Sequence, residues 1–407
     1  MGRDRVAGAR ASQGVRTRAG RPLMAADPTP APSQPAAVPN RPGGAGKRGP
    51  KWLRATKRRA TRMLSRPLVG PEPIDRLWPD AHRYPFEHRS LPLPTPDVVD
   101  MDLLPTHLEF RHAMTTFPDP EVIVLPGGVY APAWNVVLHP RSRKIVAENL
   151  SSRNNSLGPV RTLRDARVDI TVDGTCAILR TNSRGFAHTI VEDIPRAALL
   201  ACPQLADREI RLLVPEPIHE PEALLLARLL PDNVTVEAIP RGLYRIEELL
   251  FPAQVASSVA LPTWYLEHLH EVLADHIVEG SRRIYLSRGV DVARRRLTNE
   301  AEVLEGLVAR GFEVVDPGAL AFTEQIELFS SSKVIVGVHG AAFANLMFTT
   351  EPTVVELFSS PMVQPAMYLL GCGRGHRYHH LHGAGAGNND DFAIPPHELF
   401  ALVDSID

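Results

Sequence analysis

Residues 333–358 read KVIVGVHGAAFANLMFTTEPTVVELF, and the interpretation of the whole chain starts from this stretch. Val334-Ile335-Val336 is a short β-branched run, typical of a buried parallel strand. His339 and Gly340 follow where that strand would end, and a tight helix and a second strand come after them. In open α/β sheets ligands bind at the carboxyl ends of strands, and a helix amino terminus favours anions there. The stretch alone fits an anion site or a purely structural turn equally well.

Alternating strand and helix patterns extend through most of the chain. Short apolar runs predict strands at 121–125, 128–132, 134–140, 144–150, 177–179, 209–214, 234–239, 283–287, 312–315 and 377–381. Helical patterns cover 185–201 (interrupted near Pro195), 221–230, 262–278, 299–310, 323–331, 363–370 and the segment from 397. The alternation predicts parallel, doubly wound sheets in two α/β units, joined near 255–280, with a ligand cleft between them.

The predicted organisation has four parts. They are a disordered basic tail at 1–66, a first α/β domain at 67–260, a second at 261–385, and a loop and helix at 386–407. Within the first domain, the Pro-rich residues 67–120 are expected to be irregular. Residues 51–66, KWLRATKRRATRMLSR, fit either a basic helix that docks on anionic lipid or a solvated tail ahead of a later start codon.

Charge is distributed unevenly. Residues 1–66 carry 16 Lys/Arg against 2 Asp/Glu, a charge of +14, so with a total of −1 the remainder carries −15. The folded part is therefore acidic, and it gives no argument for a nucleic-acid partner.

The three cysteines, Cys176, Cys202 and Cys372, are too few and too scattered for a disulfide framework or a zinc site, and they fit a reducing compartment. The chain has no run of 18 or more apolar residues, and its start lacks the apolar core of a secretory signal. A cytoplasmic protein is expected, peripheral at the inner face of the plasma membrane if 51–66 docks on lipid.

The first candidate group lies on the helix predicted at 185–201. His188, Glu192 and Arg196 are spaced i, i+4 and i+8 and would share one face. A carboxylate that is hydrogen-bonded to an imidazole makes a tunable general base, because each group shifts the pKa of the other. The alternative is a surface salt-bridge ladder, and spacing alone favours that alternative.

The second group follows the strand predicted at 283–287. Arg288 would lie at the mouth of the sheet, and Arg294-Arg295-Arg296 precede a helix that starts near Asn299. Guanidinium groups bind phosphate oxygens in pairs, and a helix end adds backbone donors, so the group predicts a pyrophosphate site. A solvated charged loop explains any single arginine better, but it explains the cluster less well. Asn299 and Glu302 also resemble a capping box.

The third group belongs to the opening stretch. His339 can donate a hydrogen bond to a ligand, Gly340 and Ala341 allow close approach to the backbone, and Asn345 lies one turn into the helix. Glu356 would accept from ribose hydroxyls, as an acidic residue does in NAD-binding folds. Neither G-x-G-x-x-G nor G-x-x-x-x-G-K-[ST] occurs, which argues against a dinucleotide cofactor and a P-loop NTPase.

A fourth group is not expected to bind metal. His376, His379, His380 and His382 are close in sequence, but no matching Cys or Asp cluster lies at ligand spacing, so ordinary strand and loop histidines are the default.

The combined order of these motifs over about 120–385 resembles glycosyltransferase family 61, the family with the DUF563 domain. The matching residues are His188, Glu192, Pro195 and Arg196; Arg288, Arg295, Asn299 and Glu300; Gly337, His339, Gly340, Ala341 and Asn345; Val354 to Leu357; and, as a link, 312–329. Three positions depart from the family pattern: Ala342 replaces Gly, Phe343 replaces Leu, and Thr189 replaces an aromatic residue. Ala342 lies in the loop expected to bind the donor, so that change affects donor choice. Thr189 lies on the segment expected to face the acceptor, so that change affects the acceptor side.

The resemblance implies a GT-B-like α/β fold, with two Rossmann-like domains facing a central cleft and the donor held mainly by the second. We further expect an inverting transfer from a nucleotide-sugar to a hydroxyl of a glycan or glycoconjugate, without a cofactor. Because Arg288 and Arg295 would neutralise the leaving diphosphate, no divalent cation is expected. Glu192, oriented by His188, is the expected base, with the reverse assignment open. The expected donor-binding residues are Arg288, Arg295, Asn299, His339, Gly340, Ala341, Asn345 and Glu356.

The Arg-, Ala- and Pro-rich composition suggests a GC-rich bacterial source and surface polysaccharide synthesis. Two other classes stay open. One is a non-transferase Rossmann-like sugar-modifying enzyme, which the missing glycine fingerprint disfavours. The other is a catalytically inactive glycan-binding protein, which the retained charged residues disfavour.

Overall fold

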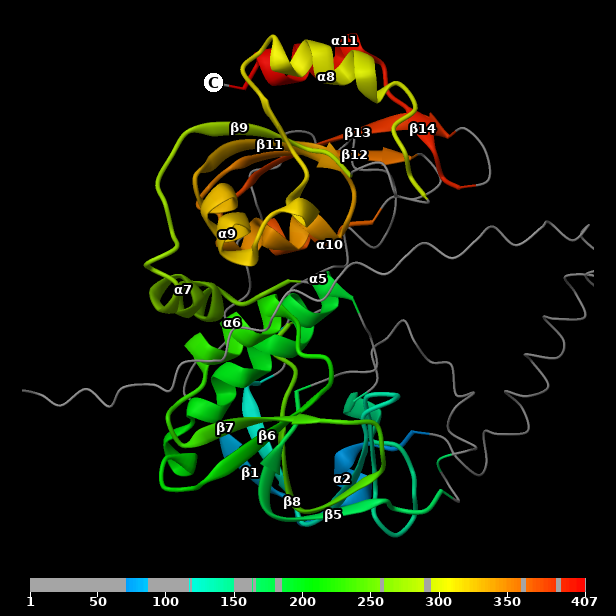
Figure 1. The fold of residues 1–407 in the computed structure, drawn as a ribbon, viewed down its shortest axis with the longest axis vertical. Coiled ribbons are helices and arrows are strands. Elements are labelled where there is room, and N and C mark those ends of the chain that lie inside the picture. The colour runs from blue at the N-terminus through cyan, green and yellow to red at the C-terminus, as the bar shows by residue number, and fades with distance from the viewer. Residues whose placement is uncertain are drawn as a thin grey trace, which may run out of the picture. The chain divides into compact units, whose positions relative to one another are not determined.

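The computed structural model describes residues 71–86, 117, 119–149, 163, 166–179, 185–256, 260–288, 294–359, 364–385 and 389–406. All of them lie in one compact unit that spans Thr56–Asp407. They form a mixed α/β structure with two sheets (Figure 1). The predicted basic tail 1–66 lies outside the described residues, so its expected disorder and lipid contact stay predictions.

The first sheet has the strand order β1-β2-β8-β5-β6-β7, with β3 and β4 attached through β8. Its strands are β1 (His82–Pro85), β2 (Glu121–Leu125), β3 (Gly128–Ala131), β4 (Val136–Leu138), β5 (Ile170–Ala177), β6 (Ile210–Pro215), β7 (Val234–Ile239) and β8 (Tyr244–Pro252). Strands β8, β5, β6 and β7 run parallel to one another, whereas β1 to β4 pair antiparallel, including the pairs of β2 and β3 with β8. The expectation of a purely parallel sheet is therefore wrong for this half.

Two further expectations about this half need correction. The strand expected at 144–150 is absent: Ile145 and Val146 form only isolated bridges, and a 3₁₀ turn, η1 (Ala147–Asn149), follows. The buried Asn149 side chain accepts a hydrogen bond from Val137 N at 2.6 Å, which replaces strand pairing there. Residues 67–120 also contain regular structure, a short helix α2 (Ile74–Leu77) and strand β1. Strand β1 pairs with β2, and Arg83 bonds to Glu121 across the pair.

The helix predicted at 185–201 is present but is not a regular α-helix. It runs as an α turn, α5 (Phe186–His188), then a π segment, η2 (Thr189–Asp193), then a 3₁₀ segment, η3 (Ile194–Ala201). Pro195 has no N–H to donate, which favours a change of hydrogen-bond pattern at this point. The short η4 (Pro203–Leu205) and the helix α6 (Glu220–Leu229) complete this side. π segments within helices are frequent at functional sites.

The second sheet has the order β10-β9-β11-β12-β13-β14 and is parallel from β10 to β13. Its strands are β9 (Arg282–Leu286), β10 (Glu313–Val315), β11 (Ser332–Val338), β12 (Thr353–Ser359), β13 (Arg377–Gly385) and β14 (Phe392–Ala393). Its helices are α7 (Thr263–Val272), α8 (Glu300–Val308), η5 (Pro317–Ala319), α9 (Phe322–Ser330), η6 (Ala341–Phe348), α10 (Ala366–Cys372) and α11 (Pro396–Asp404).

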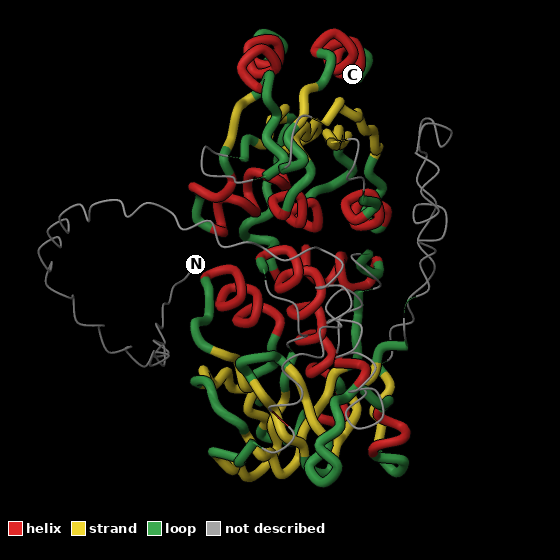
Figure 2. Tube along the Cα trace, turned by 90° about the vertical axis from the view of Figure 1, so that its right-hand side faces the viewer, coloured by secondary structure: helices red, strands yellow, loops and turns green. Residues whose placement is uncertain are grey.

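Helices cover both faces of this sheet, with α8 and α11 on one face and α9 and α10 on the other (Figures 1 and 2). Val334, Val336 and Val338 of β11 pack with α8 and α11, while Ile335 packs with α9. Because both faces are buried, β11 is a continuous apolar run, as its sequence predicts. The helix expected after it forms as 3₁₀, not α.

Other helix boundaries differ in detail. The helix α7 ends at Val272, short of the predicted residue 278. The capping box expected at the start of α8 is absent, because the Asn299 side chain bonds to Ile394 instead. No described helix has the length and apolarity that a membrane crossing would require.

Candidate active site

The predicted anion site has a physical counterpart at the carboxyl ends of β9, β10 and β11. A pocket of about 190 Å³ is lined by Arg288 after β9, Asp316 and Gly318 after β10, and Gly340 and Ala341 after β11. Three residues expected to bind the donor, Arg288, Gly340 and Ala341, are thus brought to one place. Asp316 was not among the predicted residues. The signal for it was available, because it follows a predicted parallel strand at the same sheet edge.

Arg288 lies close to the backbone at the start of η6. Its Nη1 donates a hydrogen bond to His339 O at 3.3 Å, and a Cβ atom at Gly340 would lie 3.7 Å from its Nε and Cζ atoms. Burial, together with the charge of Arg295, lowers the pKa of Arg288 to about 10. The guanidinium remains charged at neutral pH, and its environment would favour an anion.

The three consecutive arginines have different roles. Arg294 pairs with Asp390 at 2.5 Å, and Arg296 makes a two-pronged pair with Asp391 at 2.9 and 3.1 Å. Arg295 has a left-handed backbone (φ 59°), and its N donates to Asn389 O. Burial and Arg294 lower its pKa, while Asp390 and Glu356 oppose that shift.

No ion pair of Arg288 or Arg295 with a carboxylate is present within the described ranges. Arg294 and Arg296 therefore fix the loop through their ion pairs. Arg295 makes no such pair among the described residues and remains, with Arg288, beside the sheet edge.

His339 is held from behind by a buried carboxylate. Its Nδ1 lies 2.5 Å from Oε1 of Glu356, and Tyr378 donates a hydrogen bond to Oε2 of the same carboxylate. Glu356 is fully buried and His339 is 6% exposed. Because both carboxylate oxygens are engaged, the geometry gives Glu356 the role of orienting His339 and does not support the expected contact with ribose hydroxyls. Tyr378 was missed, although alternation in the predicted strand 377–381 places it on the face that Glu356 occupies.

Two predicted donor residues are engaged elsewhere. Asn345 is fully buried, and its Nδ2 donates to Gln325 Oε1 at 3.0 Å and to Ala342 O at 3.1 Å. Asn299 donates to Ile394 O at 2.8 Å and accepts from Ile394 N at 3.3 Å. These bonds anchor η6 on α9 and α8 on the C-terminal segment, so the geometry gives both asparagines structural roles.

The predicted acid–base pair is formed. Nδ1 of His188 lies 2.9 Å from Oε1 of Glu192, and the two side chains are 30% and 9% exposed. The third member of the expected ladder is not with them. Arg196 is buried on the other side of the segment, where its Nε donates to Pro252 O at 2.8 Å and its Nη1 to Leu179 O at 2.7 Å. The change from π to 3₁₀ geometry moves Arg196 off the face of His188 and Glu192.

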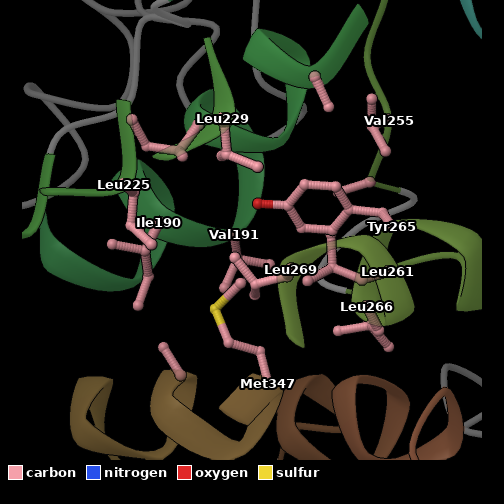
Figure 3. Packing of buried hydrophobic residues seen from close by; sticks show 14 of the residues in the cluster. Ile190, Val191, Leu225, Leu229, Val255, Leu261, Tyr265, Leu266, Leu269 and Met347 are labelled. Carbon is pink, nitrogen blue, oxygen red and sulfur yellow. The ribbon is translucent and has the colours of Figure 1, made fainter. Parts of the chain in front are cut away.

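The segment that carries this pair contacts the second sheet's helices. The segment α5 contacts η6, and the rings of Phe186 and Phe322 meet edge to face at 6.1 Å. Glu220 at the start of α6 accepts a hydrogen bond from Phe322 N at 3.2 Å. A continuous apolar cluster, which includes Val191, Tyr265 and Met347, joins these elements (Figure 3).

The histidines at 376–382 are distributed as strand and loop residues. His376 is buried, with Nε2 2.7 Å from Thr349 Oγ1, and His380 lies 2.8 Å from His382 within β13. In the part of the chain that the structure describes, no group of three or more His, Cys, Asp or Glu side chains has the geometry of a metal site.

The two sheets and the pocket at a parallel sheet edge are consistent with the α/β fold of glycosyltransferases. Residues 186–355 match the family model described as Glycosyltransferase 61. The resemblance to glycosyltransferase family 61 is thereby confirmed, and the matched region is a glycosyltransferase domain. It contains the His188–Glu192 pair, the arginine cluster and most of the opening stretch. A search of curated proteins gave no match.

Proposed function

We propose that the protein transfers a sugar, with inversion, from a nucleotide-sugar donor to a hydroxyl of a glycan or glycoconjugate. The observation that carries this proposal is the pair Arg288 and Arg295. Both are half-buried, Arg288 lines the pocket and feels the charge of Arg295, and neither forms an ion pair with a carboxylate among the residues that can be placed. Two guanidinium groups that repel each other, neither of them closed by an ion pair, favour an anionic ligand such as a diphosphate.

The leaving nucleoside diphosphate develops negative charge as the sugar–oxygen bond breaks. Arg288 and the first backbone N–H groups of η6 would stabilise that charge, because preorganised donors act most strongly where charge forms in the transition state. His339, oriented by Glu356, would donate to the same ligand. With guanidinium groups in this role, the transfer requires no divalent cation in our proposal.

The acceptor hydroxyl must lose a proton as it attacks. The geometry favours His188 as the group that meets the hydroxyl, since it is the more exposed member of the pair, and Glu192 as the carboxylate that fixes the ring. This reverses the assignment that the sequence favoured. A carboxylate on Nδ1 places the basic lone pair on Nε2 and stabilises the imidazolium that forms, as in other histidine–carboxylate pairs.

We also propose a GT-B-like arrangement, with acceptor contacts from the first sheet and donor contacts from the second. The apolar cluster shared by η2, α7 and η6 supports it. A role in bacterial surface polysaccharide synthesis at the cytoplasmic face of the membrane is the accompanying proposal, and it rests on composition alone.

A thermal-shift screen tests the donor site. The full chain is heated with UDP-, GDP-, dTDP- and CMP-linked sugars, each with and without EDTA. At least one donor should raise the melting temperature, equally in both conditions, and Arg288→Ala should abolish the rise. Arg282→Ala is the matched control, because Arg282 lies on the same strand, β9, and makes only an exposed pair with Glu313. If no donor stabilises the wild type, the proposal is wrong.

A further inference from the structure

A second and larger pocket lies at the first sheet, where the donor-site proposal places nothing. It has a volume of about 510 Å³ and lies at the carboxyl ends of β6 and β7, where Pro215 and Ile239 are the last strand residues. The β3–β4 turn closes it with Asn135, and the segment after β5 closes it with Phe186. Its size suits a small organic ligand, and the carboxyl edge of parallel strands is the usual binding edge.

The walls of this pocket combine an apolar surface with polar groups of both kinds. Phe186, Ile190 and Ile239 line it together with several prolines, and Glu216, Arg241 and Asn135 supply an acceptor, a donor and an amide that does both. Glu216 and Glu222 outnumber Arg241 among its charged lining residues, so the pocket is poorly suited to an anion. A sugar ring fits this pattern, because one face carries C–H groups and the edge carries hydroxyls that both donate and accept.

The pocket is next to the proposed acid–base pair without including it. Phe186, Thr189 and Ile190 line the pocket, whereas His188 and Glu192, from the same short segment, do not. On a helical segment these two sets point in different directions. A ligand in the pocket would therefore lie beside the reacting hydroxyl and not at it.

The same segment connects the pocket to the donor side. Phe186, a lining residue, contacts Phe322 at the start of α9, and the donor pocket is lined by Asp316 and Gly318 from the loop just before that helix. The donor pocket is also lined by Ala341, the first residue of η6, which contacts α5. The His188–Glu192 segment is thus in contact with elements of both pockets.

We propose that this pocket is a distal acceptor subsite, which binds a sugar residue adjoining the one that receives the transferred sugar. The acceptor is then an oligosaccharide of at least two sugars. This inference rests on the proposed glycosyltransferase activity, because it assigns the substrate class of the same active site.

The test measures binding of glucose, cellobiose, maltose, N,N′-diacetylchitobiose and xylobiose to the full chain by saturation-transfer difference NMR. At least one disaccharide should bind, and at least about tenfold more tightly than glucose. Arg241→Ala and Glu216→Gln should each weaken it about tenfold. Arg211→Ala, which removes another partly exposed arginine of the first sheet, from strand β6, should bind as the wild type does.

The variants also separate this inference from the proposed function. Arg241→Ala should keep the nucleotide-sugar thermal shift and the slow hydrolysis of the donor by water. If the donor shift is intact but no disaccharide binds, or binding ignores Arg241 and Glu216, the subsite is wrong and the transferase proposal stands. If disaccharides bind through Arg241 but no donor does, the pocket binds sugars and the transferase proposal fails, and the acceptor role fails with it.

Discussion

The imidazole of His339 is fixed by Glu356, whose Oε1 lies 2.5 Å from Nδ1, and Tyr378 holds the other carboxylate oxygen. Nδ1 is engaged by the carboxylate, so a ligand would be contacted by Nε2, which donates a hydrogen bond when the ring is an imidazolium. His339 directly follows β11, so its position depends on the strand and its orientation depends on the carboxylate. The orienting role of Glu356 can be tested without removing the imidazole of His339.

Glu356→Gln should reduce kcat/KM for transfer by about tenfold or more, because second-layer partners of a functional imidazole typically contribute 10- to 100-fold. The amide keeps the shape of the carboxylate, but it accepts less strongly and carries no charge to stabilise the imidazolium that donates to the ligand. Tyr378→Phe is the companion variant and should have the same direction with a smaller effect. Steady-state kinetics with the best donor measures both, and wild-type values in both would refute the orienting role.

Arg288→Ala should lower kcat/KM by about 10² to 10³, the usual cost of removing one donor to developing charge. Arg288→Lys should recover only part of this loss, since an ammonium cannot reproduce the planar guanidinium that bonds to His339 O and contacts Gly340. Circular dichroism should show that both variants are folded. Full activity of the lysine variant would mean that charge alone is required there.

His188→Ala should abolish transfer yet leave the donor-induced thermal shift unchanged, because the pair lies on the acceptor segment and not in the donor pocket. Glu192→Gln should retain measurable transfer, reduced by about 10² or more, since the ring remains but loses its orienting charge. The reverse ranking, with Glu192→Gln the more damaged variant, would return the base assignment to the carboxylate. Both rates are measured as product formed under saturating donor.

The sequence predicted most of the strands, because apolar runs such as those of β6, β7, β11 and β12 are short and bounded by turn residues. It missed β8, the strand at the centre of the first sheet. Tyr244–Pro252 contains Arg245, Glu247 and Glu248, so its first half reads as a polar segment. Those charges pair with neighbours, as when Glu248 binds Arg208 and Thr175, and pairing across strands cannot be deduced from one strand alone.

The carboxyl-edge rule placed Arg288, Gly340 and Ala341 at one sheet edge, and these three residues line one pocket there. It could not separate Arg295 from Arg294 and Arg296, because their partners Asp390 and Asp391 are 96 and 95 residues away. The inward turn of Arg196 was equally hidden, since it depends on a π segment that no spacing pattern reveals. A sequence pattern therefore does not predict which distant residues pair or which type of helix forms locally.

Acid should destabilise the fold through buried neutral histidines. Burial and the charge of Arg374 lower the pKa of His376 to about 3 and that of His270 to about 4, from an ordinary value of 6.5. The unfolded chain therefore binds more protons than the folded chain at acidic pH. The stability of the fold is not reduced by these histidines above pH 6.5, and it decreases as the pH falls from there toward 3 or 4.

Urea unfolding at several pH values should show this slope. His376→Gln should reduce the slope by up to about 1.4 kcal/mol per pH unit, the value for one proton. An unchanged slope in His376→Gln would assign the acid sensitivity to other groups.

Tyr265→Phe should stabilise the protein. The Tyr265 hydroxyl is buried in the cluster of Figure 3, among Val191, Leu229 and Leu261, and has no hydrogen-bond partner among the described residues. An unpaired buried polar group costs about 1–3 kcal/mol, and removing the oxygen leaves the ring packing intact. We expect a gain of about 1 kcal/mol in the free energy of unfolding, measured by urea denaturation, with unchanged activity. Leu261→Ala is the contrasting variant and should cost about 2–5 kcal/mol through a cavity in the same cluster. A loss of stability in Tyr265→Phe would show that the hydroxyl has a bonded partner, such as a buried water.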